Sequence, residues 1–126
     1  MIEIRRIEEI GGTETEWLRA KHHFALGSYG NPAHRPLGNL YALNDDEIAP
    51  HTGFAQHGHA NVEIVTYVRQ GVVTHADSMG NEGHIAAGDV QVMSAGTGIR
   101  HSERNDGPIP TRLFQIGNYI HESSSP

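Results

Sequence analysis

The chain lacks several features that would place it in well-known classes of protein. It contains no cysteine, which excludes disulfide bonds and metal sites built from thiolates. No apolar run approaches the roughly 18 residues that a membrane-spanning helix needs. The opening residues, Met1-Ile-Glu-Ile-Arg-Arg6, contain no apolar core of the signal-peptide type. We therefore expect a cytoplasmic protein that makes no contact with a membrane.

Positive charge is also scarce. Nine Lys and Arg residues stand against fifteen Asp and Glu residues, for a formal net charge of −6. The basic residues are scattered, whereas a surface that binds nucleic acid carries a basic patch. We expect no direct contact with nucleic acid. The sequence also has no Gly-x-Ser-x-Gly or Gly-x-x-x-x-Gly-Lys segment, which gives no support to a nucleophilic serine or a phosphate-binding loop.

Turn-forming residues are abundant. Fifteen glycines and six prolines occur in 126 residues, a length that suits one domain with its own core. They separate short apolar or alternating runs, which is the pattern of an all-β sandwich or barrel. The predicted strands are 38–44, 59–69, 72–78, 83–87, 90–94, 99–105 and 111–116. We also expect an edge strand at 2–7, a short strand at 22–26, and an end to the 38–44 strand at the acidic residues 45–47.

Ten histidines are many for this length. Three of them, together with one glutamate, form a pattern of two spaced pairs. His57 and His59 are two residues apart, as are His101 and Glu103 about 40 residues later. Side chains two apart in a strand share a face. Two such strands lying side by side would bring three imidazoles and one carboxylate to a common point, where burial without an ion would be costly.

This donor set contains nitrogen and oxygen but no sulfur. It suits one divalent transition metal, with iron(II) the first choice and manganese, nickel, copper or zinc as alternatives. The competing interpretation is that these histidines are surface groups or hydrogen-bonded core groups. We favour the metal because two ligand pairs on two predicted strands are far more specific than a single His-x-His pair.

Other polar residues have open roles. If the chain is extended from His57 onward, Glu63 shares the face of His57 and His59 and is a candidate further ligand, hydrogen-bond partner of a ligand, or proton carrier. An acid bonded to turn amides is the plainer alternative. His75 and His84 lie near predicted turns, and we interpret both as surface residues.

Longer segments resemble the two conserved motifs of the cupin superfamily. These segments are Gly53-Phe-Ala-Gln-His57-Gly-His59-x-x-x-Glu63 and Gly88-Asp-x-Gln-x-Met-Ser-Ala-Gly96 with His101-x-x-x-Asn105. Within cupins, Glu63-Ile-Val-Thr-Tyr67 and Met93-Ser-Ala-Gly-Thr-Gly98 are similar to the pirin family. The resemblance covers most of residues 17–116.

The resemblance implies a fold and a function. The fold would be a cupin double-stranded β-helix, a jelly-roll barrel, and the metal ligands would be His57, His59, His101 and Glu103. Bacterial members resemble quercetin 2,3-dioxygenases, which open a flavonol ring with O2. We therefore expect an aromatic small-molecule substrate and O2, with Glu103 transferring a proton and Glu63 orienting the site. Eukaryotic pirin is a nuclear iron protein that modulates transcription factors, so an iron-dependent redox sensor that acts on a protein partner is the alternative.

Pirins usually contain two cupin domains. The resemblance assigns residues 1–117 to one such domain and residues 118–126 to a tail. The second domain of a pirin normally covers one face of the first. We therefore expect a homodimer in which a second copy covers that face.

Overall fold

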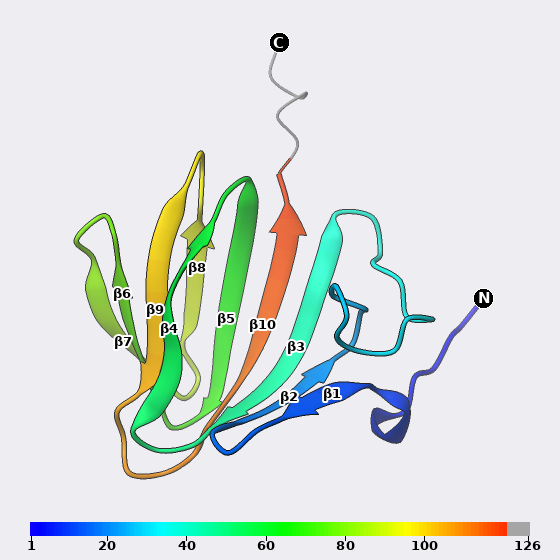
Figure 1. Cartoon of the computed structure of the whole chain (residues 1–126), viewed down its shortest axis with the longest axis horizontal. Coiled ribbons are helices and arrows are strands. Elements are labelled where there is room, and N and C mark those ends of the chain that lie inside the picture. Colours follow the sequence, from blue (N-terminus) through cyan, green and yellow to red (C-terminus); the bar gives the residue numbers. More distant parts are fainter. Residues whose placement is uncertain (121–126) are drawn as a thin grey trace.

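Ten strands form two antiparallel sheets that face each other, as the computed structural model of residues 1–120 shows (Figure 1). One sheet has six strands in the order β1-β2-β3-β10-β5-β8, and the other has four in the order β4-β9-β6-β7. The strands are β1 (Gly12–Glu14), β2 (Leu18–His22), β3 (Leu40–Ile48), β4 (Thr52–His59), β5 (Val62–Gln70), β6 (Val72–Asp77), β7 (Glu82–Ala86), β8 (Val90–Ser94), β9 (Ile99–Asn105) and β10 (Thr111–Tyr119). The predicted all-β class is confirmed.

Alternating burial along the strands places the core between the sheets. In β5, Val62, Ile64 and Val68 are buried, whereas Glu63 and Tyr67 on the same strand are exposed. One apolar cluster joins both sheets and comprises Leu18, Ala20, Ile48, Val68, Val73, Ile85 and Leu113. A second and smaller cluster comprises Val62, Ile64, Met93 and Ala95. Burial of such side chains contributes about 1.5–3 kcal/mol each and holds the two sheets together.

The strand predicted at 59–69 begins at Val62, three residues later than expected, because His59 and Val62 belong to different sheets. β4 ends at His59, and β5 begins at Val62 in the larger sheet. Between them, Asn61 has a φ of 59°, a left-handed conformation that Asn adopts more readily than most residues. The chain changes direction there, so the side-chain alternation of β5 is not a continuation of that in β4.

The N-terminal half departs furthest from the predictions. Residues 2–6 are not in a strand, and a 3₁₀ turn spans Ile7–Glu9. The predicted strand at 22–26 lies earlier, at Leu18–His22, where it pairs with β3. β3 itself continues through the acidic residues to Ile48, because Asp45 and Glu47 point outward from the sheet while Asp46 is buried.

The C-terminal strand is longer than predicted. β10 runs to Tyr119 and pairs with both β3 and β5 at the centre of the six-stranded sheet. It therefore extends two residues past the predicted end of the domain at 117. Residues 121–126 of the predicted tail lie outside the described residues, and that assignment stays a prediction.

Close approach of β4 to β9 depends on Gly53. A Cβ atom at this position would lie 2.4 Å from the carbonyl oxygen of Glu103 and 2.5 Å from the Cα of Arg104. Both are backbone atoms that can move only with the strand. Gly58, on the same strand, has more room, since its nearest neighbours would be 3.8 Å away.

We predict that Gly53→Ala separates β4 from β9 and lowers the free energy of unfolding by about 1–3 kcal/mol, as overpacking does in other cores. Gly58→Ala is the control and leaves stability within about 0.5 kcal/mol of the parent protein. Urea unfolding followed by circular dichroism measures both. Equal stability of the two variants would contradict the proposed close approach.

Candidate metal centre

Three histidine side chains converge on one point between the sheets. The Nε2 atom of His101 lies 2.9 Å from Nε2 of His57 and 3.1 Å from Nε2 of His59. One ligand atom from each residue lies within 4.8 Å of the others. His101 is buried, and His57 and His59 are half-buried. The structure thus brings together the three histidines that the sequence pattern selected.

A β-bulge in β4 gives His57 its direction. Phe54 pairs with Glu103 and His57 pairs with His101, so β4 has one more residue than β9 over the same span. An extra residue reverses the alternation of side chains beyond it. Phe54 and His57 therefore line the same cavity although they are three residues apart. His59 follows on the same face by ordinary strand alternation.

The distances fit a metal ion. Two nitrogen ligands about 2.1 Å from one ion and at right angles to each other are about 3.0 Å apart, which matches the observed separations. The ring Nδ1 of His57 donates to the carbonyl oxygen of Ala55 at 2.8 Å. Because a carbonyl cannot donate, Nδ1 carries the proton and Nε2 presents a lone pair, as in metal-bound histidines. The lone pair on Nε2 of His57 therefore faces Nε2 of His101, where it can accept a proton donor or bind a cation.

Glu103 lies next to this cluster on β9. Its carboxylate is 3% exposed, and Oε1 lies 3.7 Å from Nε2 of His101. Gln115 on β10 donates to both carboxylate oxygens at 3.0 Å, and Thr66 on β5 donates to the Gln115 oxygen at 2.9 Å. This chain of hydrogen bonds fixes Glu103 from the opposite sheet. The carboxylate is therefore held beside the histidine cluster by residues of the other sheet.

Burial controls the charges of the site. Burial, followed by the neighbouring imidazoles, lowers the pKa of His101 to about 4. Burial and then His57 lower the pKa of His59. Both changes favour the neutral form that a metal requires. Burial raises the pKa of Glu103, which the hydrogen bonds from Gln115 partly oppose.

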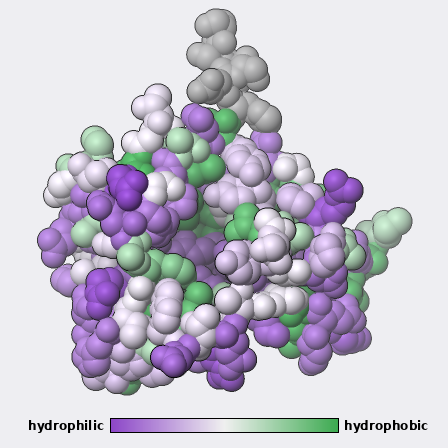
Figure 2. All heavy atoms as spheres, viewed as in Figure 1, coloured by the Kyte–Doolittle hydropathy of each residue, from purple (hydrophilic) through white to green (hydrophobic). Residues whose placement is uncertain are grey.

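The cluster opens onto a cavity of about 310 Å³. His57, His59 and Glu103 form one side of this cavity, and Asp46 and Gln115 on the larger sheet form another. The remaining lining residues are Leu26, Tyr41, Ala42, Asn44, Phe54, Ile64 and Gly117. Figure 2 shows that the molecule is hollowed near the centre of the face seen in Figure 1. Mixed apolar walls with a few polar groups are typical of small-molecule sites.

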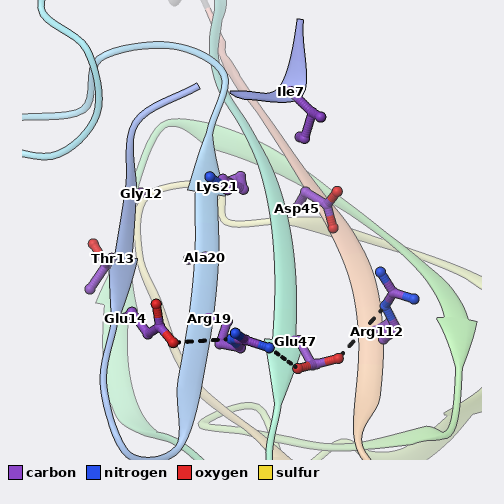
Figure 3. Close-up of a pocket in the computed structure, with 10 residues that line it drawn as sticks. All are labelled: Ile7, Gly12, Thr13, Glu14, Arg19, Ala20, Lys21, Asp45, Glu47 and Arg112. Carbon is purple, nitrogen blue, oxygen red and sulfur yellow. Dashed lines mark hydrogen bonds and ion pairs between the residues drawn. The ribbon is translucent and has the colours of Figure 1, made fainter. Parts of the chain in front are cut away.

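A larger hollow, of about 470 Å³, lies elsewhere on the β1–β2–β3–β10 end of the six-stranded sheet (Figure 3). Arg19 contacts Glu14 at 3.3 Å and Glu47 at 3.8 Å, and Arg112 contacts Glu47 at 3.8 Å. These charges neutralise one another, and no histidine is among the described residues that line the hollow. This hollow therefore offers no imidazole ligands for a transition metal.

Two interpretations from the sequence are wrong. Glu63 is exposed and faces away from the cavity, because the turn at Asn61 separates its strand from that of His59; the structure gives it no place in the site. His75 is buried rather than on the surface. It donates from Nε2 to Asp77 at 3.0 Å, and its ring lies 5.5 Å from that of His101. His84 is exposed, as expected.

Asp46 is a site residue that the sequence analysis missed. It is 4% exposed and lines the cavity with Glu103. Burial, and then the charges of Glu103 and Asp45, raise its pKa to about 7. If the strand is continued through residues 45–47, Asp46 faces the opposite side of the sheet from Asp45 and Glu47. This alternation is the signal that could have revealed it.

Comparisons with known proteins agree with this geometry. The family model described as Pirin matches residues 3–117. The chain is similar to a pirin-like protein of Caulobacter vibrioides, with 54% identity over 116 residues that cover 92% of this chain and 50% of that protein. It is also similar to quercetin 2,3-dioxygenase of Escherichia coli K12, with 46% identity over 117 residues, covering 92% of this chain and 51% of that protein.

A solved structure, the bacterial pirin YhhW of Escherichia coli in complex with nickel(II), superimposes with a TM-score of 0.89 and 42% identity over 97% of this chain and 53% of that one. The predicted cupin fold is therefore confirmed. The chain spans about half the length of the relatives it matches. Among residues 1–120, no helix is long and apolar enough to cross a membrane.

We predict that the three imidazoles hold one ion. Titration of the metal-free protein with Ni²⁺ in a calorimeter should give one site per chain. His59→Ala should weaken it by more than about 100-fold, since loss of a ligand's outer partner alone costs 10–100-fold. His84→Ala, which removes an exposed histidine, is the control and should bind like the parent protein. Equal affinity of His59→Ala and the parent protein would contradict the site.

Proposed function

Because the chain belongs to the pirin family, we propose that it is a metal-dependent dioxygenase that acts with O2 on a flavonol-like enediol or catechol. The observation that supports this proposal is the cavity of about 310 Å³ onto which His57 and His59 open. A closed shell of ligands with no space beside it would instead favour the alternative, an iron-dependent redox sensor. Under that alternative, the chain would bind a protein partner, which stays a prediction.

We propose His57, His59, His101 and Glu103 as the ligands, and iron(II) as the metal. Three imidazoles and a carboxylate without sulfur suit iron(II), and also manganese, nickel, copper and zinc. The nickel(II) complex of YhhW supports a transition metal in a fold of this kind. A bound ion supplies Lewis acidity toward the oxygens of the substrate and a position for O2.

The chain's own residues would bind the substrate and move one proton. Glu103 is the proposed base, which accepts the hydroxyl proton of the substrate at a carboxylate oxygen. Its position beside the histidine cluster, with Oε1 3.7 Å from Nε2 of His101, places it within reach of a hydroxyl group of a substrate bound there. Gln115 keeps the carboxylate oriented while the charge changes. Apolar side chains of Phe54 and Ile64 exclude water from the aromatic rings.

We further propose a homodimer. Outward-facing side chains of β10, β5 and β8 form two apolar rows, because Phe114, Tyr67 and Val90 are neighbours in register, as are Ile116, Val65 and Val92. Val90 and Val92 are 56% and 65% exposed. A sheet face of this kind favours association.

We predict that the protein loaded with iron(II) under nitrogen consumes quercetin when air is admitted, seen as loss of the visible absorbance of the flavonol. Manganese- and nickel-loaded samples are tested in parallel. Glu103→Gln should lower kcat by at least about 100-fold, the usual contribution of a general base, while His84→Ala should not change it. No turnover with any of the three metals would refute the proposed activity.

For the dimer, light scattering after gel filtration should give twice the mass of one chain, which is 13.8 kDa. Val92→Arg places a charge on the apolar rows and should produce a monomer. Ile109→Arg changes an apolar residue that is exposed but belongs to another segment, and should remain dimeric. A monomeric parent protein would contradict this proposal.

A further inference from the structure

Asp46 is a buried carboxyl group that the fold does not use. It lies on β3 opposite Ala20 of β2 and Leu113 of β10, and both of those neighbours are apolar and buried. Its Oδ1 atom is shielded from solvent and has no hydrogen-bond partner within residues 1–120. An unpaired buried polar group is unfavourable because it loses its hydrogen bonds to water without gaining others. This carboxyl group therefore destabilises the metal-free protein, which points to a partner that comes from outside the chain.

The nearest charges offer no compensation. Asp45 on the same strand pairs with Arg69 on the outer face of the sheet, where Arg69 also lies 4.2 Å over the ring of Phe114. Glu103, across the cavity, carries the same sign as Asp46 and acts on it electrostatically. Among residues 1–120, Asp46 thus differs from its neighbour Asp45, because no cation and no hydrogen-bond donor is paired with it.

Asp46 occupies the junction of two cavities. The first is the 310 Å³ cavity of the histidine cluster, and the second has about 290 Å³ and lies toward β2. Four residues line both: Leu26, Asn44, Asp46 and Phe54. We call these four shared residues the neck; Leu26 and Phe54 are its apolar members, and Asn44 and Asp46 are its polar members. The two cavities adjoin at these residues, so a ligand that occupied both would lie against Asp46.

The second cavity is suited to an aromatic or aliphatic group. Leu18, Ala20 and Tyr29 contribute apolar surface to its lining. Both ring nitrogens of His22 in this lining have partners, since Nδ1 donates to Asn44 Oδ1 at 3.0 Å and Nε2 accepts from Thr13 at 3.2 Å. A ring that enters this space gains apolar contact without breaking a hydrogen bond. Asp46 is then the polar group with unused capacity at the neck.

We propose that Asp46 is a substrate-positioning residue: its carboxylate accepts a hydrogen bond from a hydroxyl group in the middle of a two-ring substrate that spans both cavities. One ring, which carries the enediol or catechol oxygens, lies at the histidine cluster, and the second ring lies in the cavity toward β2. This inference rests on the proposed function and extends it, because it assigns selectivity for two-ring compounds over single-ring catechols to one residue.

The test uses binding rather than turnover. The nickel-loaded protein is titrated under nitrogen with quercetin and, separately, with catechol. Trp17 is the single tryptophan of the chain, and its ring lies 5.1 Å from that of Phe54 in the neck, so quenching of its fluorescence reports occupancy there. Competition by catechol against quercetin gives the affinity of the smaller ligand. The variants are Asp46→Leu, Asp46→Asn and, as the matched control on the outer face of the same strand, Asp45→Asn.

We expect Asp46→Leu to weaken quercetin binding about tenfold, the effect of about 1.4 kcal/mol, while catechol affinity and nickel content stay the same. Asp46→Asn, whose amide can also donate and accept, should stay within about threefold of the parent protein, as should Asp45→Asn. Unchanged quercetin affinity in Asp46→Leu would overturn the inference. So would an equal loss for both ligands or a loss of nickel, since either would place Asp46 at the metal instead. Failure of the parent protein to bind either ligand would refute the proposed function, and this inference with it.

Discussion

The arrangement of the site depends on one constraint, the convergence of three imidazole nitrogens at about the separation of cis ligands on a single ion. Without a cation, one Nε2–H of a pair can donate to the other nitrogen, but three imidazoles cannot all present lone pairs at this distance without one, so the fold must hold the donors in place for an ion. The bulge before His57, the glycine at 53 that lets β4 approach β9, and the Ala55 carbonyl that fixes the His57 tautomer all serve this purpose. Burial of the two apolar clusters stabilises the fold and so offsets the free energy needed to hold the donors together.

Charge is distributed unevenly around this point. The described arginines that form ion pairs do so with side chains that are exposed or half-buried, as Arg19, Arg69 and Arg112 do. The two acids that face the cavity, Asp46 and Glu103, have no ion pair with a described arginine or lysine, and burial raises the pKa of each. A divalent cation at the histidines would favour their ionised forms, because opposite charge lowers the pKa of a carboxyl group. The interior is thus built for positive charge that the chain itself does not provide.

Features of the fold and the site that depend on residues close together in the sequence could be predicted, whereas features that depend on distant residues or on backbone conformation could not. Alternation within a strand is local, so the pairs His57/His59 and His101/Glu103 were correctly placed on common faces. The break between His59 and Glu63 was missed because it depends on the backbone conformation of Asn61, which no hydrophobic pattern marks. Asp46 was missed because a run of three acids looks like the end of a strand, and its continuation is decided by pairing of β3 with β10, some 65 residues away. The burial of His75 likewise depends on its position beside β9 in the sheet.

The most direct test of this account is a crystal structure of the iron- or nickel-loaded protein with anomalous scattering measured at the edge of the metal. We predict one anomalous peak per chain, about 2.1 Å from the Nε2 atoms of His57, His59 and His101, with an oxygen of Glu103 or water completing the shell toward the cavity. A peak at any other position, or an ion held by fewer than these three imidazoles, would contradict it.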